Sequence, residues 1–246
     1  MRFMVVTAGV VVMLISGPTS AQNLIANPGF EQGNAAFQSD YSFSAGGNCC
    51  EGQYTVRGNG SSFNGSFVNP PPSSTGSTLM MVINGSNVAN QRIWYQSIGV
   101  TPGQRYTLNV RGCTAVAGGP AIIQWQVSGA LVGTGVSLPS QTGMWVDIDA
   151  EWTAPEGVTS IELAIRDLNT ATFPNDFYLD DLVMLAADEP CAPDFNGDGN
   201  LDPDDLGDFI NCYFSMPACP EADFNSDGNT DPDDLGDFIN AYFAGC

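Results

Sequence analysis

The sequence contains no histidine and no lysine, and its only basic residues are six arginines. Without histidine or lysine the chain cannot build the Ser-His, Cys-His or Ser-Lys systems that activate nucleophiles. The formal net charge is −21 at pH 7. Such a chain repels nucleic acid and anionic membranes and attracts cations, so we expect no nucleic-acid partner.

Long apolar runs are also scarce, since only residues 3–15 form one, directly after Met1-Arg2. Ser16, Gly17 and Pro18 interrupt the run, and small residues precede Gln22. The run is too short for a membrane span, which needs about 20 residues, so a membrane anchor is the weaker alternative. The pattern predicts a signal peptide over 1–21 and a secreted protein, extracellular or at the cell surface, without membrane insertion.

The carboxylates are concentrated at the C-terminal end, where 15 of the 27 lie between Asp188 and Asp237 and no basic residue occurs. Residues 194–214 and 223–243 read DFNGDGNLDPDDLGDFINCYF and DFNSDGNTDPDDLGDFINAYF, identical at 18 of 21 positions. This is a tandem duplication of one supersecondary unit.

Each copy carries the ligand spacing of an EF-hand calcium loop. Side-chain oxygens fall at positions 1, 3 and 5, glycine at 6, a backbone carbonyl at 7, an Asp acting through water at 9, and Asp in place of Glu at 12. A metal-free turn region and a thrombospondin-type repeat, which lacks the following helix, are the alternatives. We predict two calcium ions, held by Asp194, Asn196, Asp198, Asn200, Asp202 and Asp205, and by Asp223, Asn225, Asp227, Asn229, Asp231 and Asp234.

A short amphipathic helix is predicted after each loop. Asp202 can cap the first helix and Pro203 suits its first turn. Apolar residues then recur at i, i+3, i+4 and i+7 in both copies, and prolines before each loop argue against an entering helix. The two half EF-hands can bury their apolar faces against each other, through Leu206, Phe209, Ile210 and Tyr213 and through Leu235, Phe238, Ile239 and Tyr242.

Residues 191–246 resemble dockerin modules, in particular the cysteine-bearing dockerin-like modules of secreted bacterial proteins. The resemblance implies two calcium ions and a cohesin-like scaffold partner. Dockerins often recognise that partner through Ser or Thr at loop positions 10 and 11 and through basic residues late in the helix. Here Pro203-Asp204 and Pro232-Asp233 occupy those positions and the tail has no basic residue, so the partner is not identified.

Seven cysteines fit an oxidising compartment. The four in the tail allow three pairings. Cys212 lies near the end of the first helix and Cys219 just before the second loop. If the two units are related by a pseudo-two-fold axis, the equivalent bridge joins the end of the second helix to the start of the first loop, at Cys246 and Cys191. We predict Cys212–Cys219 and Cys191–Cys246. Cys49, Cys50 and Cys113 leave at least one cysteine unpaired or paired between chains.

Residues 22–186 alternate short apolar runs with Gly, Ser, Asn and Pro turns, which is typical of an antiparallel β-sandwich. Residues 58–78 are expected to form a long loop. We predict a mostly β protein: a jelly-roll sandwich over 22–186, a linker at 187–190 and a small α-helical calcium module over 191–246. The predicted strands are 79–83, 92–100, 105–111, 121–127, 144–152, 160–166 and 177–184.

The segments NLIANPGFE (23–31) and NDFYLDDL (175–182) resemble the opening and closing strands of galactose-binding-like jelly rolls and family 4/9 carbohydrate-binding modules. The resemblance implies a polysaccharide partner and one structural calcium at Glu31 and Asp180. The alternative is that Glu31 is a surface residue and Asp180 a hydrogen-bonding residue at a strand end.

Glycan binding requires aromatic platforms beside hydrogen-bonding side chains. The candidates are Trp94, Tyr95 and Trp125, with Arg111, Gln124 and Gln126, although aromatic residues in strands are mostly core. The one carboxylate cluster of the front, Asp147, Asp149 and Glu151, also has the pattern of an ordinary solvent face.

These patterns favour a secreted, non-catalytic calcium-binding protein that tethers a glycan-binding sandwich to an extracellular assembly. A structural or adhesive protein whose sandwich binds protein, and a polysaccharide-active enzyme, remain as alternatives.

Overall fold

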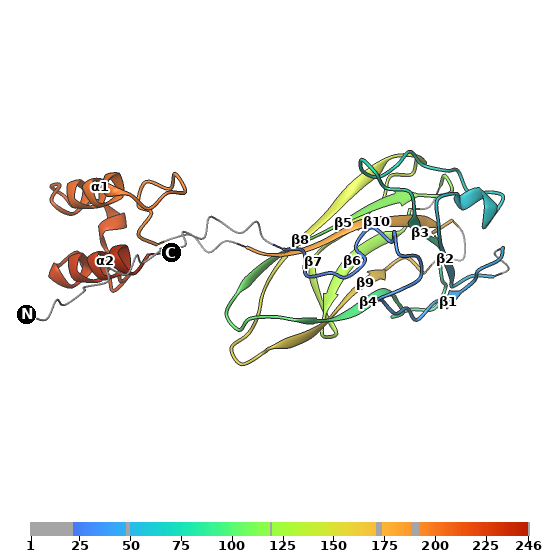
Figure 1. The fold of residues 1–246 in the computed structure, drawn as a ribbon, viewed down its shortest axis with the longest axis horizontal. Coiled ribbons are helices and arrows are strands. Elements are labelled where there is room, and N and C mark those ends of the chain that lie inside the picture. The colour runs from blue at the N-terminus through green and yellow to red at the C-terminus, as the bar shows by residue number, and fades with distance from the viewer. Residues whose placement is uncertain (1–21, 48–49, 119, 171–173, 188–191, 246) are drawn as a thin grey trace, which may run out of the picture. The chain divides into compact units, whose positions relative to one another are not determined.

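The computed structural model describes residues 22–47, 50–118, 120–170, 174–187 and 192–245. The predicted signal peptide, nearly all of the predicted linker and the predicted bridge Cys191–Cys246 lie outside these residues. The chain divides into two compact units (Figure 1). One holds the β-sheets, and the other holds both helices together with the short segments Thr101–Arg105 and Thr153–Val158.

The first sheet of the sandwich has six strands in the order β1-β2-β3-β10-β5-β8 (Figure 1). β10 lies between β3 and β5 and is antiparallel to both, whereas the short β1 is parallel to β2. The strands are β1 (Ser42–Phe43), β2 (Gln53–Arg57), β3 (Met80–Asn84), β5 (Arg105–Thr114), β8 (Trp145–Thr153) and β10 (Phe177–Ala186).

The second sheet has four strands in the order β4-β9-β6-β7. They are β4 (Arg92–Gly99), β6 (Ile122–Val127), β7 (Ala130–Ser137) and β9 (Ser160–Asp167), and neighbouring strands are antiparallel. The β6–β7 hairpin turns at Ser128 and Gly129, both with positive φ, as a two-residue hairpin of matching twist requires.

The predicted β-sandwich is confirmed, with every predicted strand present to within a few residues. The core lies between the sheets, where Ile165 of β9 is paired on one side with Trp94 and on the other with Trp125. All three side chains are fully buried. β1, β2 and β7 were not predicted from the sequence. β7 is a largely exposed strand with two glycines, which weakens its strand pattern.

The predicted long loop over 58–78 contains only one short 3-10 turn, η1 (Gly60–Ser62). It is anchored on β10, because Phe67 packs edge-on against Tyr178 and the Tyr178 hydroxyl donates to the Val68 carbonyl at 3.1 Å. Gly60 permits this approach, since a Cβ there would lie 2.2 Å from the Tyr178 hydroxyl oxygen. The anchored loop brings the segment 73–78 over Asp180.

The second unit contains α1 (Pro203–Tyr213) and α2 (Pro232–Ala244), with a 3-10 turn η2 (Pro220–Ala222) before the second loop. Both predicted helices are confirmed. Each begins after an Asp cap that forms a capping box with the Asp three residues on. The helices meet at Phe209 and Phe238, whose parallel rings lie 3.9 Å apart. No helix among the described residues is long and apolar enough to cross a membrane.

Candidate functional site

The two acidic loops have the same internal hydrogen bonds. Asp194 accepts the Asp198 N–H at 3.1 Å and the Gly199 N–H at 2.8 Å. Gly199 has φ of +86°, which is why the sharp turn at loop position 6 needs glycine. The second loop repeats this geometry at 3.0 Å and 2.9 Å with Asp223, Asp227 and Gly228.

The last predicted ligand position of each loop is a fully buried aspartate. Asp205 accepts the N–H of Asp202 at 2.8 Å and of Asn196 at 3.2 Å, and Asp234 is held in the same way by the equivalent residues. The N–H of Asp202 is the main cause that lowers the pKa of Asp205, so the buried group is held ionised. The tail has no Lys, Arg or His that could pair with either carboxylate.

The donor types of the loops suit calcium, which prefers carboxylate, amide and carbonyl oxygens. The Asp205 carboxylate contacts that of Asp194. Over the described part of the chain, however, the only three His, Cys, Asp or Glu side chains with ligand atoms within 4.8 Å of one another are Cys212, Cys219 and Glu221. These two sulfurs are joined in a disulfide, so this group is not a metal site. The Cys212–Cys219 disulfide is the first of the two bridges predicted from the duplication.

Glu31 and Asp180, the predicted third site, both lie near Gly29. A Cβ at Gly29 would lie 3.8 Å from Oδ1 of Asp180, 3.8 Å from Oδ1 of Asp181 and 4.0 Å from Cγ of Glu31. Asp180 is buried, which raises its pKa to about 6.

Residues at the end of the loop over 58–78, together with Leu79, donate hydrogen bonds to Glu31 and Asp180. The N–H groups of Thr78 and Leu79 donate to Glu31 at 2.7 and 2.8 Å, and the hydroxyls of Ser73 and Ser77 donate to Asp180 at 2.5 and 2.7 Å.

Asp181 is the residue that sequence reasoning missed at this site. Its Oδ2 is buried and finds no hydrogen-bond partner among the described residues. The residue has φ of +51° at an irregularity in the β10–β5 pairing, and this turns its side chain to the same side as that of Asp180. The doubled Asp180-Asp181 sequence was the available signal. An unpartnered carboxylate oxygen fits a cation in donor type, but carboxylate oxygens of Glu31, Asp180 and Asp181 do not all lie within 4.8 Å of one another.

The predicted glycan-contacting role of Trp94 and Trp125, and the predicted closeness of Arg111 to Gln124 and Gln126, are wrong. Trp94 and Trp125 are fully buried, and the Trp125 indole donates to the Ile148 carbonyl at 2.9 Å within the core. Both are core residues and cannot form platforms. Arg111 lies on β5, in the other sheet from Gln124 and Gln126, and approaches Asp147 at 3.6 Å.

The remaining predicted residues lie in the four-stranded sheet. Ala164 of β9 is paired with Tyr95 on one side and with Gln126 on the other. Tyr95 is half-buried. Gln126 is buried and donates to the Gly129 carbonyl at 2.8 Å, and Gln124 donates to the Gly133 carbonyl at 2.8 Å. Of the predicted glycan-contacting set, Tyr95 is therefore the aromatic residue that remains available.

Tyr95 lines an open pocket of about 510 Å³. Arg92 covers one face of the ring, with its guanidinium carbon 3.8 Å from the ring centre. It also pairs with Asp40 at 2.8 Å and with Glu162 at 2.7 Å. The hydrogen bond from Arg92 lowers the pKa of Asp40. The pocket is lined by Ala36, Phe37, Gln38, Tyr95, Gln96, Ser97 and Glu162, so an aromatic ring stands among amide, hydroxyl and carboxylate groups.

Asp147, Asp149 and Glu151 all lie on β8, and Asp147 and Asp149 both approach the side-chain amide of Asn109. Asp149 and Glu151 line a second pocket of about 300 Å³. Every carboxylate in its lining comes from this one strand, whereas glycosidases place two carboxylates on either side of the scissile bond.

No family model and no curated protein matches the chain. Several solved structures are similar to parts of the chain. A sugar-binding EclA C-terminal domain is 22% identical, with a TM-score of 0.35 over 38% of this chain and 66% of that one. A tandem CBM22 domain of Paenibacillus barcinonensis Xyn10C is 14% identical, with a TM-score of 0.45 over 71% of this chain and 49% of that one.

A xylan-binding CBM22 domain is 12% identical, with a TM-score of 0.42 over 68% of this chain and 97% of that one. The chain thus spans less than two thirds of the EclA and tandem structures and nearly all of this third one. At these identities and TM-scores the likenesses identify no ligand.

Proposed function

We propose that this is a secreted, non-catalytic protein that attaches a glycan-binding β-sandwich to an extracellular assembly through a calcium-loaded, dockerin-like tail. Two calcium ions would be held by the paired loops, and a third by Glu31, Asp180 and Asp181. A cohesin-like scaffold protein and a polysaccharide are the partners that this function requires.

The observation that carries the proposal is the pair of buried aspartates, Asp205 and Asp234, in two loops of the same geometry. Each is held by backbone N–H groups, and no basic side chain exists in the tail to balance it. A divalent cation supplies that balance and would draw the loop oxygens together. When bound, calcium would neutralise the loop carboxylates and fix the geometry of the loops. The helices would then present the surface of the tail to the scaffold partner.

The pocket at Tyr95 supports the glycan part of the proposal. Sugar rings stack on exposed aromatic faces and hydrogen-bond to polar side chains at the edge. Because Arg92 covers one face of Tyr95, a sugar would have to meet the opposite face or the edge of the ring. Arg92 is fixed in turn by its two ion pairs, so the ring is held in place before a ligand arrives.

The test uses the full chain with a panel of soluble plant and algal polysaccharides in affinity electrophoresis. Tyr95→Ala should abolish the retardation that the wild-type chain shows. Phe43→Ala, which removes another exposed aromatic ring of the sandwich, should leave it unchanged. Equal retardation of wild type and Tyr95→Ala would contradict the glycan site. Calcium binding is tested separately by titration calorimetry. The double variant Asp194→Ala, Asp223→Ala should show no heat of calcium binding.

A sandwich that binds protein instead of sugar is the second candidate, favoured by the exposed apolar side chains Val68, Val88 and Met144. It predicts no retardation by any polysaccharide.

A further inference from the structure

The segment that follows α1 presents large apolar side chains to solvent. Phe214 is 69% exposed and Met216 is 100% exposed, and Ile210, one turn earlier on α1, is 37% exposed. Single exposed apolar residues are common on protein surfaces, but neighbouring ones held together mark interaction sites.

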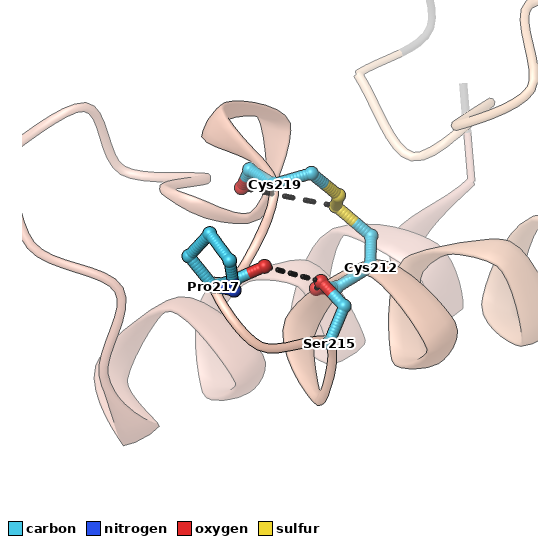
Figure 2. Close-up of a disulfide and its surroundings, with 4 residues drawn as sticks. All are labelled: Cys212, Ser215, Pro217 and Cys219. Carbon is cyan, nitrogen blue, oxygen red and sulfur yellow. Dashed lines mark hydrogen bonds between the residues drawn. A yellow bond between two sulfur atoms is a disulfide. The ribbon is translucent and has the colours of Figure 1, made fainter.

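This segment is closed into a small loop by the Cys212–Cys219 disulfide (Figure 2). The Ser215 hydroxyl lies 2.8 Å from the carbonyl oxygens of both Cys212 and Pro217, and the Cys219 N–H donates to the Cys212 carbonyl at 3.4 Å. At its start, the Phe214 N–H donates to the Ile210 carbonyl at 3.0 Å. The backbone that carries Phe214 and Met216 is therefore fixed in advance, which lowers the entropic cost of docking.

The charge around this closed loop limits what can cover it. The Glu221 carboxylate lies within 4.8 Å of the two bridge sulfurs, Asp208 is exposed on α1, and the whole tail lacks a basic residue. A second copy of the chain would bring the same negative charge to the contact, and an anionic membrane would also be repelled. A complementary surface must combine apolar groups with a positively charged rim.

We propose that the loop closed by Cys212 and Cys219 is the docking surface of the tail, and that its partner is a different protein with an apolar recess rimmed by Lys and Arg. Phe214 and Met216 fill the recess, and Glu221 and Asp208 face the basic rim. The inference rests on the proposed tethering function and names the surface and the partner chemistry for it.

The experiment selects a phage-displayed library of random peptides on the immobilised full chain in calcium. Enriched peptides should combine a large apolar residue with Lys or Arg, and their affinity should fall as salt is added. Phe214→Ser combined with Met216→Ser should weaken the selected peptides by about 100-fold, since two buried apolar anchors are lost. Phe243→Ser is the matched control, because Phe243 is the repeat equivalent of Phe214, is 79% exposed and lies outside the closed loop; it should retain wild-type affinity.

Both variants replace exposed side chains, and an unchanged circular dichroism spectrum in calcium verifies that they fold. Peptides that bind the double variant as tightly as wild type, or that lack basic residues, would overturn the inference. So would self-association in sedimentation velocity, or binding to phosphatidylcholine vesicles, that the double variant loses. Calcium-dependent peptides that bind elsewhere on the tail would overturn this surface but leave tethering intact, whereas the absence of any calcium-dependent ligand would remove both.

Discussion

The carboxyl group of Asp167, at the end of β9, gives the sandwich a predictable dependence on pH. Burial raises the pKa of Asp167 to about 7, and the nearby carboxylate of Asp176 adds to the shift. Tyr41 also faces it: burial raises the pKa of Tyr41, and the charge of Asp167 adds to that shift. Oδ1 of Asp167 accepts the N–H groups of Ile122 and Asn169 at 2.9 and 2.8 Å, so an amide oxygen could replace it.

Because the pKa in the folded state lies above the value near 3.9 of an unfolded chain, the folded state binds the proton more tightly. The stabilisation is fully present below about pH 4 and is lost as the pH rises to about 7. A difference of about 3 pKa units corresponds to at most about 4 kcal/mol. Asp167→Asn keeps the Oδ1 acceptor and removes the charge, so it should match wild type near pH 4 and exceed its stability at pH 8 by up to about 4 kcal/mol.

Urea unfolding at a fixed calcium concentration, followed by the fluorescence of the buried tryptophans, measures this difference at intervals from pH 4 to pH 8. Asp149→Asn, on the exposed side of β8, is the matched control and should follow the wild-type curve. If the stability difference between Asp167→Asn and wild type does not grow with pH, burial of this carboxylate does not control the stability of the sandwich.

Three further predictions concern the tail and the proposed lack of catalysis. Chelating calcium should reduce the helical circular dichroism of the full chain, because helices this short do not persist alone; Asp194→Ala with Asp223→Ala should act like chelation, and unchanged helicity would contradict it. Phe238→Ala, at a fully buried ring stacked on Phe209, should destabilise the tail by about 3–5 kcal/mol, whereas Phe243→Ala at an exposed ring should not, as thermal unfolding in calcium can measure. The purified chain should release no reducing sugar from a polysaccharide panel, and activity that Asp149→Ala abolishes would refute the non-catalytic assignment.

The signals that the sequence carries locally were sufficient for the two helices of the tail. Loop spacing, an Asp cap followed by proline and an apolar face with a period near 3.6 depend on residues a few positions apart, so they predicted α1 and α2 with their caps. The same period pointed to the meeting of Phe209 and Phe238, because two half EF-hands have few other ways to bury those faces.

The sequence by itself thus determined the duplicated loops, the two capped helices and the β-sandwich class. Only the tertiary structure decided which face of each strand lies inside. Trp94 and Tyr95 are neighbours and must point to opposite sides of their strand; packing between the two sheets buried the tryptophan and left the tyrosine at the pocket. Strand pairing likewise placed Arg111 and Gln124 in different sheets, and the fold brought Glu31 near Gly29 together with Asp180 and Asp181. The physical reason is that strand alternation has a period of two and fixes neighbours as opposites, while the choice of inner face depends on contacts between residues far apart in the chain.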